Sequence, residues 1–240
     1  MRQKIGKFKS SIGTLELTER ALYGNTLILA EEGSGKTHLA NKIRNFVIEN
    51  DVPTLYLDFS DPDVADVEER FKSSAHFFYM RFEESDTFCD ALQEAIKQRK
   101  DIYMAVNPKY FSYKRDKKSK ISKMLQTPEL LEHYYYFFHE ISHLNAFYTK
   151  FEDFLIYILN LVNLKKFGLT FLTQPHETFE DPKIKLVFTF LFLGKCSNAN
   201  YYNTSVLKNL KPNTFYHQSR SDNKTLLFNA VHSDIVYIDE

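Results

Sequence analysis

Short apolar runs alternate with segments of helical periodicity along most of the chain. Residues 26–30 (TLILA) are apolar and β-branched, which predicts a strand, and residues 37–50 follow with apolar positions at helical spacing, which predicts a helix. Further strands are predicted at residues 54–59, 76–82, 102–106, 134–138, 168–172 and 186–193. Further helices are predicted at residues 64–72, 87–98, 128–132 and 151–162. Residues 214–217 and 225–231 predict a C-terminal β-hairpin.

This order of elements predicts the fold class. Strands that alternate with helices are typical of a mostly parallel, twisted sheet with helices on both faces. The chain shows no internal repeat, no low-complexity block and no convincing linker. The sequence therefore predicts an α/β protein with one domain over residues 1–240.

The composition limits the classes of binding partner and the cellular location that we expect. The 240 residues include 31 Lys and Arg and 31 Asp and Glu, so the formal net charge is zero, which excludes a globally basic nucleic-acid coat protein. The two cysteines cannot form a disulfide framework, and residues 1–13 lack the apolar segment of a signal peptide. The longest apolar stretch, residues 186–193, is far shorter than the roughly 20 residues that span a bilayer. We therefore expect a cytoplasmic protein without a transmembrane segment.

A glycine-rich turn joins the first predicted strand to the first predicted helix. Residues 30–37 read AEEGSGKT, which is the phosphate-binding P-loop pattern with Ala30 in place of its first glycine. Glycines in such a turn allow the backbone amides to surround an anion, and the helix directs its positive end toward the same place. Lys36 is predicted to reach the β- and γ-phosphates of ATP, and the Thr37 hydroxyl to bind Mg²⁺. The predicted nucleotide-binding residues are Glu32, Gly33, Ser34, Gly35, Lys36, Thr37 and His38.

Two glutamates in this turn are unusual, because a carboxylate near a bound anion is unfavourable. Glu31 and Glu32 are therefore predicted to point outward or toward a cation.

The aromatic strand at residues 134–138 runs directly into His139 and Glu140. P-loop ATPases usually carry an Asp–Glu pair at such a strand end, where the Asp holds the magnesium shell and the Glu activates the attacking water. Glu140 stands at the position of the catalytic Glu, whereas His139 replaces the Asp. Asp58, at the end of the strand at residues 54–59, is a candidate for part of the metal-binding role, as is Glu140 itself.

The same residues also spell H-E-x-x-H, from His139 to His143. On a helix this pattern places two histidines on one face as zinc ligands, with Glu140 as the general base of a peptidase. The aromatic run before His139 favours a strand instead. A zinc metallopeptidase nevertheless stays open as the alternative from another functional class.

The strand at residues 168–172 ends in Thr173 and Gln174. A polar side chain at the end of a strand next to the P-loop strand can reach the γ-phosphate or the attacking water. Gln174 is therefore the predicted sensor of the nucleotide.

Residues 109–123 contain seven basic side chains and one acid, in a chain of zero net charge. Such a segment can neutralise DNA phosphates without recognising sequence. Lys114, Arg115, Lys117 and Lys118 are the predicted DNA contacts. A solvated basic loop is the alternative.

These motifs, in this order, resemble the FtsK–HerA superfamily of DNA-pumping ATPases. That superfamily includes chromosome translocases, conjugation and secretion ATPases, and the genome-packaging ATPases of membrane-containing icosahedral viruses. The resemblance covers about residues 24–235, and its specific parts are residues 33–37, Glu140, Thr173 and Gln174. His139 departs from the Asp of the family.

The resemblance implies a RecA-like P-loop NTPase core that hydrolyses ATP with Mg²⁺ and moves double-stranded DNA through a homo-oligomeric ring, expected to be a hexamer. The compact chain is most similar to the viral members. This implies packaging of a viral genome, with a capsid or membrane portal component as partner at a virion vertex. ATPases of conjugation, secretion or filamentous-phage assembly are the alternatives within the superfamily.

In such rings an arginine from the neighbouring subunit completes each site. The candidates are Arg81, Arg99, Arg115 and Arg220, and Arg220 is the first choice because it lies in the predicted C-terminal hairpin region.

Overall fold

The computed structural model describes residues 6–10, 13–60, 77–82, 86–107, 113–114, 117–118, 120–146, 160–176, 179, 186–197, 205–220 and 231–238. The chain divides into two compact units. Unit 1 comprises Met1–Asn50 and Thr170–Glu240, and unit 2 comprises Asp51–Leu169. The single domain predicted over residues 1–240 stays a prediction.

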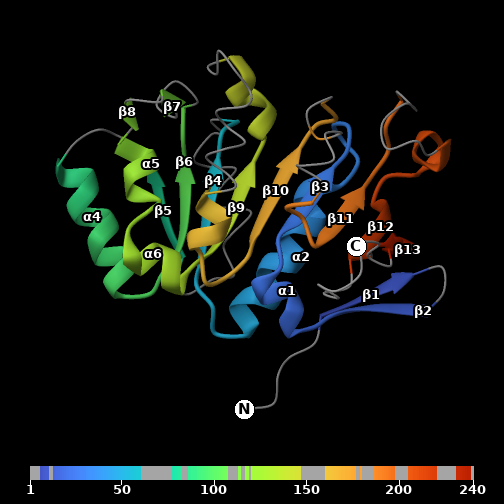
Figure 1. Ribbon diagram of the computed structural model, residues 1–240, viewed down its shortest axis with the longest axis horizontal. Coiled ribbons are helices and arrows are strands. Elements are labelled where there is room, and N and C mark those ends of the chain that lie inside the picture. The colour runs from blue at the N-terminus through green and yellow to red at the C-terminus, as the bar shows by residue number, and fades with distance from the viewer. Residues whose placement is uncertain are drawn as a thin grey trace. The chain divides into compact units, whose positions relative to one another are not determined.

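Unit 1 is built on a mixed sheet. Strand β3 (Thr26–Leu29) lies between two parallel neighbours, β10 (Leu169–Thr173, in unit 1 from Thr170) and β11 (Phe190–Leu193) (Figure 1). Beyond β11 the pairing is antiparallel, through β12 (Thr214–Arg220), β13 (Val231–Tyr237), β1 (Gly6–Ser10) and β2 (Gly13–Leu17). The helical elements of this unit are α1 (Glu19–Tyr23), α2 (Lys36–Glu49) and the 3-10 helix η5 (Ser205–Asn209).

The core of unit 1 follows the predicted pattern. Every residue of β3 is buried, and α2 buries the apolar face expected from its helical spacing, including Leu39, Ile43 and Phe46. The C-terminal hairpin is confirmed, with the register Thr214↔Tyr237 to Arg220↔Val231. Residues 221–230 lie outside the described residues, so only the end of the strand predicted at 225–231 is seen in β13.

The strand predicted at residues 186–193 is shorter than expected. β11 begins at Phe190, and Leu186 and Val187 form a turn in which Leu186 is 67% exposed. Phe190 pairs with Thr26, the first residue of β3. Residues 186–189 therefore extend beyond the end of the partner strand, and the backbone amides of Thr189 and Phe190 instead donate to the Asn25 carbonyl at 2.8 and 3.0 Å.

Unit 2 contains a fully parallel sheet in the order β9–β4–β6–β5. Its strands are β4 (Thr54–Asp58), β5 (Phe77–Arg81), β6 (Asp101–Ala105) and β9 (Tyr135–His139) (Figure 1). Every residue of β4, β6 and β9 is buried, as expected of parallel strands whose two faces are both covered. The described helical elements of this unit include α4 (Asp86–Lys97), α5 (Lys120–Met124), α6 (Pro128–His133) and the 3-10 helix η2 (Ile141–Ala146).

Two contacts fix the order of the central strands of unit 2. The Asp101 Oδ1 atom accepts the Thr54 amide at 2.9 Å and the Thr54 hydroxyl at 2.8 Å, which joins the starts of β4 and β6. The Tyr56 ring stacks on Tyr103 and Phe137, with centroid distances of 5.1 and 5.6 Å. These contacts align the carboxyl ends of β4, β6 and β9, where Asp58 and His139 stand.

The α/β fold class and the extensive parallel pairing are confirmed. The helix predicted at residues 64–72 and most of the one predicted at 151–162 lie outside the described residues; residues 160–164 are helical. Among the described residues, no helix combines the length and the apolar character needed to cross a bilayer.

Candidate functional site

The predicted P-loop joins β3 to α2 in unit 1. Gly33 has a φ of +71° and Gly35 a φ of +92°, and Gly35 occupies the position that caps the start of α2. These left-handed conformations cost little only for glycine, and they are typical of anion-binding loops. The loop therefore has the backbone form that a phosphate site requires.

Lys36 lies within this loop rather than on the surface. Its side chain is buried, and its Nζ atom donates to the Ala30 carbonyl at 3.0 Å and to the Glu31 carbonyl at 3.3 Å. The positive charge is thus held against the backbone of the turn, directly before the first turn of α2.

Ala30, which replaces the first glycine of the pattern, is accommodated by a glycine elsewhere. A Cβ atom added to Gly194 would lie 2.6 Å from the Ala30 Cβ and 3.0 Å from the Phe215 ring. Gly194 follows β11, and its amide donates to the Leu29 carbonyl at 2.8 Å. The missing side chain at position 194 therefore leaves the space that the Ala30 methyl group occupies.

Gly194→Ala is expected to lower the free energy of unfolding by about 1–3 kcal/mol, because its methyl group has no room beside Ala30. Urea denaturation measures the change. Ala30→Gly removes the opposing methyl group, so a double-mutant cycle should show a coupling energy that favours the double variant. Strictly additive effects of the two substitutions would contradict this packing.

Glu31 points toward Ser197. Its Oε1 atom accepts the Ser197 amide at 2.5 Å and its Oε2 atom accepts the Ser197 hydroxyl at 3.0 Å. The hydrogen bond from the Ser197 backbone lowers the pKa of the Glu31 carboxyl. Glu32 is exposed. The negative charge of Glu31 is thus stabilised by the exposed Ser197 rather than by a cation, and the exposed Glu32 agrees with the expected outward orientation.

Asn213 contacts the P-loop, and the sequence motifs do not point to it. Its backbone amide donates to the Ser34 carbonyl at 3.1 Å. Its side-chain Oδ1 atom lies 2.1 Å from the position that a Cβ atom on Gly35 would take. Gly35 is therefore required both for its positive φ and for this close approach. The contact joins residues 178 positions apart in sequence, from Gly35 to Asn213, and only the pairing of β12 within the sheet brings them together.

The predicted sensor follows a neighbour of the P-loop strand. β10 pairs in parallel with β3, with Thr173 opposite Leu29, and the Thr173 carbonyl accepts the Ala30 amide at 3.2 Å. Gln174, the next residue, is exposed. The strand order expected from the position of Thr173 and Gln174 is therefore present in unit 1.

In unit 2, Asp58 ends β4 directly opposite His139, the last residue of β9. Asp58 is fully buried. Its Oδ1 atom accepts the Ser60 amide at 2.8 Å and the Ser60 hydroxyl at 2.6 Å. Its Oδ2 atom accepts the Tyr103 hydroxyl and lies 2.9 Å from the His139 Nδ1 atom.

These neighbours keep Asp58 ionised. Burial raises the pKa of the Asp58 carboxyl, but the hydrogen bond and charge of His139, with the hydroxyl groups of Ser60 and Tyr103, lower the pKa to about 2. The carboxylate is therefore a buried anion at neutral pH, with hydrogen bonds from Ser60 and Tyr103 and with His139 at ion-pair distance.

Glu140 follows His139 with an unusual backbone. Its φ is +54°, which is uncommon for a residue with a side chain. Its Oε1 atom lies 3.9 Å from the His139 Nε2 atom, and its Oε2 atom accepts the Ser142 hydroxyl at 3.4 Å. The side chain is 13% exposed. The strained conformation turns this carboxylate out of the strand, beside the imidazole of the preceding residue.

The structure contradicts the zinc-peptidase interpretation of H-E-x-x-H. His139 ends β9 and His143 lies in the 3-10 helix η2, so the two rings do not share a face of an α-helix. The Nδ1 atom of His143 is 3.1 Å from the Phe59 carbonyl, and His139 faces Asp58. Within the described part of the chain, no group of three or more His, Cys, Asp or Glu side chains could hold a metal ion.

The basic segment contains a small hairpin. Lys114 lies in β7 (Tyr113–Lys114) and Lys117 and Lys118 in β8 (Lys117–Lys118), with Lys114 opposite Lys117. Arg115 lies outside the described residues.

The four arginines predicted as candidates to complete the site of a neighbouring subunit lie at different places in the sequence and the fold. Arg81 is exposed at the end of β5, and Arg220 ends β12. The guanidinium of Arg99 donates to the Asp51 carbonyl at 3.3 Å. Arg99 thus has a contact within unit 2, and Arg81 is exposed.

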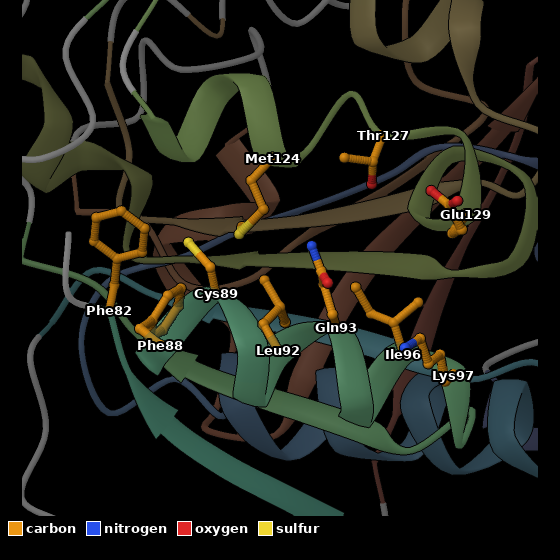
Figure 2. A pocket seen from close by; sticks show the side chains of 10 residues that line it. All are labelled: Phe82, Phe88, Cys89, Leu92, Gln93, Ile96, Lys97, Met124, Thr127 and Glu129. Carbon is orange, nitrogen blue, oxygen red and sulfur yellow. The ribbon is translucent and has the colours of Figure 1, made fainter. Parts of the chain in front are cut away.

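Unit 2 also holds a pocket of about 440 Å³, drawn in Figure 2. Phe88, Leu92 and Ile96 from one face of α4 line it, opposite Met124 of α5. None of the predicted nucleotide, metal or DNA residues lines this apolar pocket, so it is separate from the predicted chemistry.

No protein-family model matches the sequence, and no similar sequence was found among curated proteins. Solved structures that share the fold include VirB4 of Thermoanaerobacter pseudethanolicus, with a TM-score of 0.61 and 9% identity over 98% of this chain and 96% of that one. They also include B204, the DNA-packaging ATPase from Sulfolobus turreted icosahedral virus, with a TM-score of 0.52 and 13% identity over 88% of this chain and 98% of that one. The pCW3 conjugation coupling protein TcpA with ATPγS has a TM-score of 0.52 and 13% identity, over 99% of this chain and 66% of that one. At these identities the matches show a shared fold, and this is the fold that the predicted resemblance implies.

Proposed function

We propose that this chain hydrolyses ATP to move double-stranded DNA, and that it packages a viral genome into a capsid. The observation that carries the ATPase proposal is the P-loop of unit 1, with left-handed Gly33 and Gly35 and the buried Lys36 ammonium at the start of α2. A positive charge and inward amides at a helix start form a site for the phosphates of a nucleotide.

The proposed roles follow the sequence motifs. Residues 32–38 bind the nucleotide, and Lys36 neutralises charge that develops on the β- and γ-phosphates. Glu140 accepts a proton from the water that attacks the γ-phosphorus, as the bond to the β–γ bridging oxygen breaks. Gln174 senses the γ-phosphate, and Arg220 of a neighbouring subunit completes the site in a homo-oligomeric ring, proposed to be a hexamer.

Mg²⁺, when bound with ATP, would offset the charge of the phosphates. Thr37 and Glu140 stay the proposed protein ligands. Asp58 does not fit this role, because its carboxylate is fully buried, its Oδ1 atom accepts the Ser60 amide and hydroxyl, and its Oδ2 atom accepts the Tyr103 hydroxyl.

The proposal of DNA packaging rests on the fold. B204, named as a DNA-packaging ATPase, aligns over 98% of its own chain. VirB4 and TcpA share the fold as well, so conjugation, secretion and filamentous-phage assembly are the other candidate roles. A packaging role would place the protein at a virion vertex with a capsid or membrane portal component.

Two measurements test this function together. The purified chain should release phosphate from ATP, and linear double-stranded DNA should stimulate that release. A translocating ring should also displace a third strand from a DNA triplex in an ATP-dependent way. ATP hydrolysis that DNA does not stimulate, with no displacement of the third strand, would support an ATPase but contradict the proposal of a DNA motor.

Replacing Lys114, Arg115, Lys117 and Lys118 with Ala is expected to weaken binding to every DNA sequence alike. Each lost phosphate contact should flatten the slope of log affinity against log salt by about 0.9. Basal ATP hydrolysis should persist, whereas its stimulation by DNA should fall. Fluorescence anisotropy at several salt concentrations measures the slope.

The matched control removes the same charge from other surfaces, with Ala at the exposed Lys97, Lys166, Lys208 and Lys211. Its salt slope should stay at the value of the unmodified protein. Equal slopes for both quadruple variants would show that the basic segment is a solvated loop.

A further inference from the structure

We infer that Asn213 is a positioning residue of the P-loop: it orients the peptide group between Ser34 and Gly35 so that the Gly35 amide donates to a phosphate oxygen. The inference rests on the proposed ATPase function and adds to the site a residue that lies far from the motif in sequence. Asn213 and the P-loop both belong to unit 1.

The backbone of Asn213 determines the direction of this peptide group. Its amide donates to the Ser34 carbonyl at 3.1 Å. In a planar, trans peptide group the carbonyl and the amide hydrogen point in opposite directions. Because the Ser34 carbonyl is directed to Asn213, the Gly35 amide points away from Asn213.

The Gly35 amide is also left for a ligand. Gly35 caps the start of α2, and the first amides of a helix have no acceptor within the helix. Within the described part of the chain, no backbone carbonyl accepts the Gly35 amide. An amide at this position is suited to donate to an anion, and the phosphates of a nucleotide are the anions that the proposed function supplies.

The Asn213 side chain packs against the same residue. The position that a Cβ atom on Gly35 would take lies 2.1 Å from the Asn213 Oδ1 atom and 3.2 Å from the Asn213 Cα atom. This close approach exists only because residue 35 has no side chain. Asn213 therefore binds the Ser34 carbonyl with its backbone and contacts Gly35 with its side chain.

Asn213 is itself held in place by the strands on either side. Its carbonyl accepts the Ile238 amide at 2.8 Å, directly after β13, and the Thr214 amide at the start of β12 donates to the Lys211 carbonyl at 3.2 Å. Its φ is +57°, a left-handed conformation that Asn tolerates better than most residues with a side chain. This conformation determines where the Asn213 amide points, and so which residue type position 213 accepts.

The expected kinetic effect follows from the kind of contact. A hydrogen bond from Gly35 to a phosphate oxygen is present in the bound substrate and in the transition state alike. Its loss should therefore raise the KM for ATP and leave kcat nearly unchanged. Hydrogen bonds to charged groups correspond to about a 10- to 100-fold change in affinity.

The first experiment observes the Gly35 amide in the unmodified protein. Ser34 and Gly35 form the only Ser–Gly pair in the sequence. Cell-free synthesis with carbonyl-carbon-13 serine and nitrogen-15 glycine therefore gives a single amide signal in a carbonyl-filtered NMR spectrum. We expect ADP with Mg²⁺ to shift this amide proton downfield, because a hydrogen bond to an anion deshields the proton. Adenosine, which has no phosphate, should not shift it.

Asn213→Val and Asn213→Gly test the role of the backbone conformation. A β-branched residue strongly disfavours a φ of +57°, whereas glycine adopts it freely. We expect Asn213→Val to raise the KM for ATP about 10- to 100-fold and to abolish the shift that ADP causes at Gly35. Asn213→Gly should retain the KM and the shift of the unmodified protein, because its amide keeps the direction that binds Ser34.

Asp51→Val is the matched control. Asp51 is exposed, belongs to unit 2 and has a φ of +60°, so the variant introduces the same backbone strain outside unit 1. Its KM for ATP and its Gly35 signal should not change. Urea denaturation should show a comparable loss of stability in the two Val variants, which separates the effect on nucleotide binding from the effect on folding.

The outcomes distinguish this inference from the proposed function. A Gly35 signal that does not shift when ADP binds would overturn the inference, as would an unchanged KM in Asn213→Val or an equal rise of KM in Asp51→Val. Equal losses in Asn213→Val and Asn213→Gly would also overturn it, because they would not depend on the left-handed backbone. An unmodified protein that neither binds ADP nor hydrolyses ATP would instead contradict the proposed function itself.

Discussion

Lys36→Ala is expected to lower kcat for ATP hydrolysis by about 100- to 1000-fold, the size of effect seen when a group that stabilises transition-state charge is removed. In unit 1 the Lys36 ammonium is held against the carbonyls of Ala30 and Glu31, within the predicted P-loop. Without this ammonium group, no cationic side chain of the loop would neutralise the negative charge on the β- and γ-phosphates. Phosphate release measures the rate, and binding of a fluorescent ATP analogue measures the weaker affinity.

The fold should survive this change. Lys36 is buried, but it contributes two hydrogen bonds to backbone carbonyls and no apolar packing that we identify, so the loss of stability should be about 1 kcal/mol. Lys42→Ala, on the same helix α2, removes the same charge outside the P-loop and should retain activity. Hydrolysis by Lys36→Ala at a rate near that of the unmodified protein would contradict the nucleotide site.

Glu140→Gln is expected to retain ATP binding and to lower kcat by about 100- to 10,000-fold, the range for removal of a general base. Gln has the shape of Glu and can occupy the same backbone conformation, but its amide does not accept the proton of the attacking water. The variant should therefore accumulate bound, unhydrolysed ATP. Rapid gel filtration followed by nucleotide analysis measures the ratio of ATP to ADP on the protein.

Glu132→Gln is the control for this variant, because Glu132 is exposed on α6 in the same unit and has no proposed role. Its kcat should not change. Metal analysis of the unmodified protein adds an independent check: stoichiometric zinc, with no ATP hydrolysis, would support the peptidase interpretation that the positions of His139 and His143 disfavour.

Elements that rest on strong local patterns were predictable from the chain. The apolar run of β3, the helical spacing of α2 and the aromatic run of β9 all form the predicted structures, with bounds shifted by at most one residue. By contrast, the hydrophobic pattern does not predict β1 (GKFKS) and β2 (GTLEL). These short, polar segments become strands because they pair with each other and with β13 at the antiparallel side of the sheet of unit 1.

The sequence by itself determined the local chemistry of this protein. Gly33, Gly35 and Lys36 predict a phosphate loop from backbone freedom and charge within a few consecutive residues, and the observed φ values follow from glycine at these positions. Likewise, the five aromatic residues before His139 were enough to favour a strand over the helix that a zinc peptidase requires. Such features depend on neighbours in sequence, so they can be recognised without a fold.

Only the tertiary structure decided which distant residues support these motifs. Gly194 makes room for Ala30, Asn213 lies against Gly35, and Asp58 holds His139. No local pattern indicates these pairs, because each depends on the register between strands or on the loop that follows a strand. A shift of β9 against β4 by one residue would place a different side chain opposite Asp58 and turn His139 to the other face of the sheet.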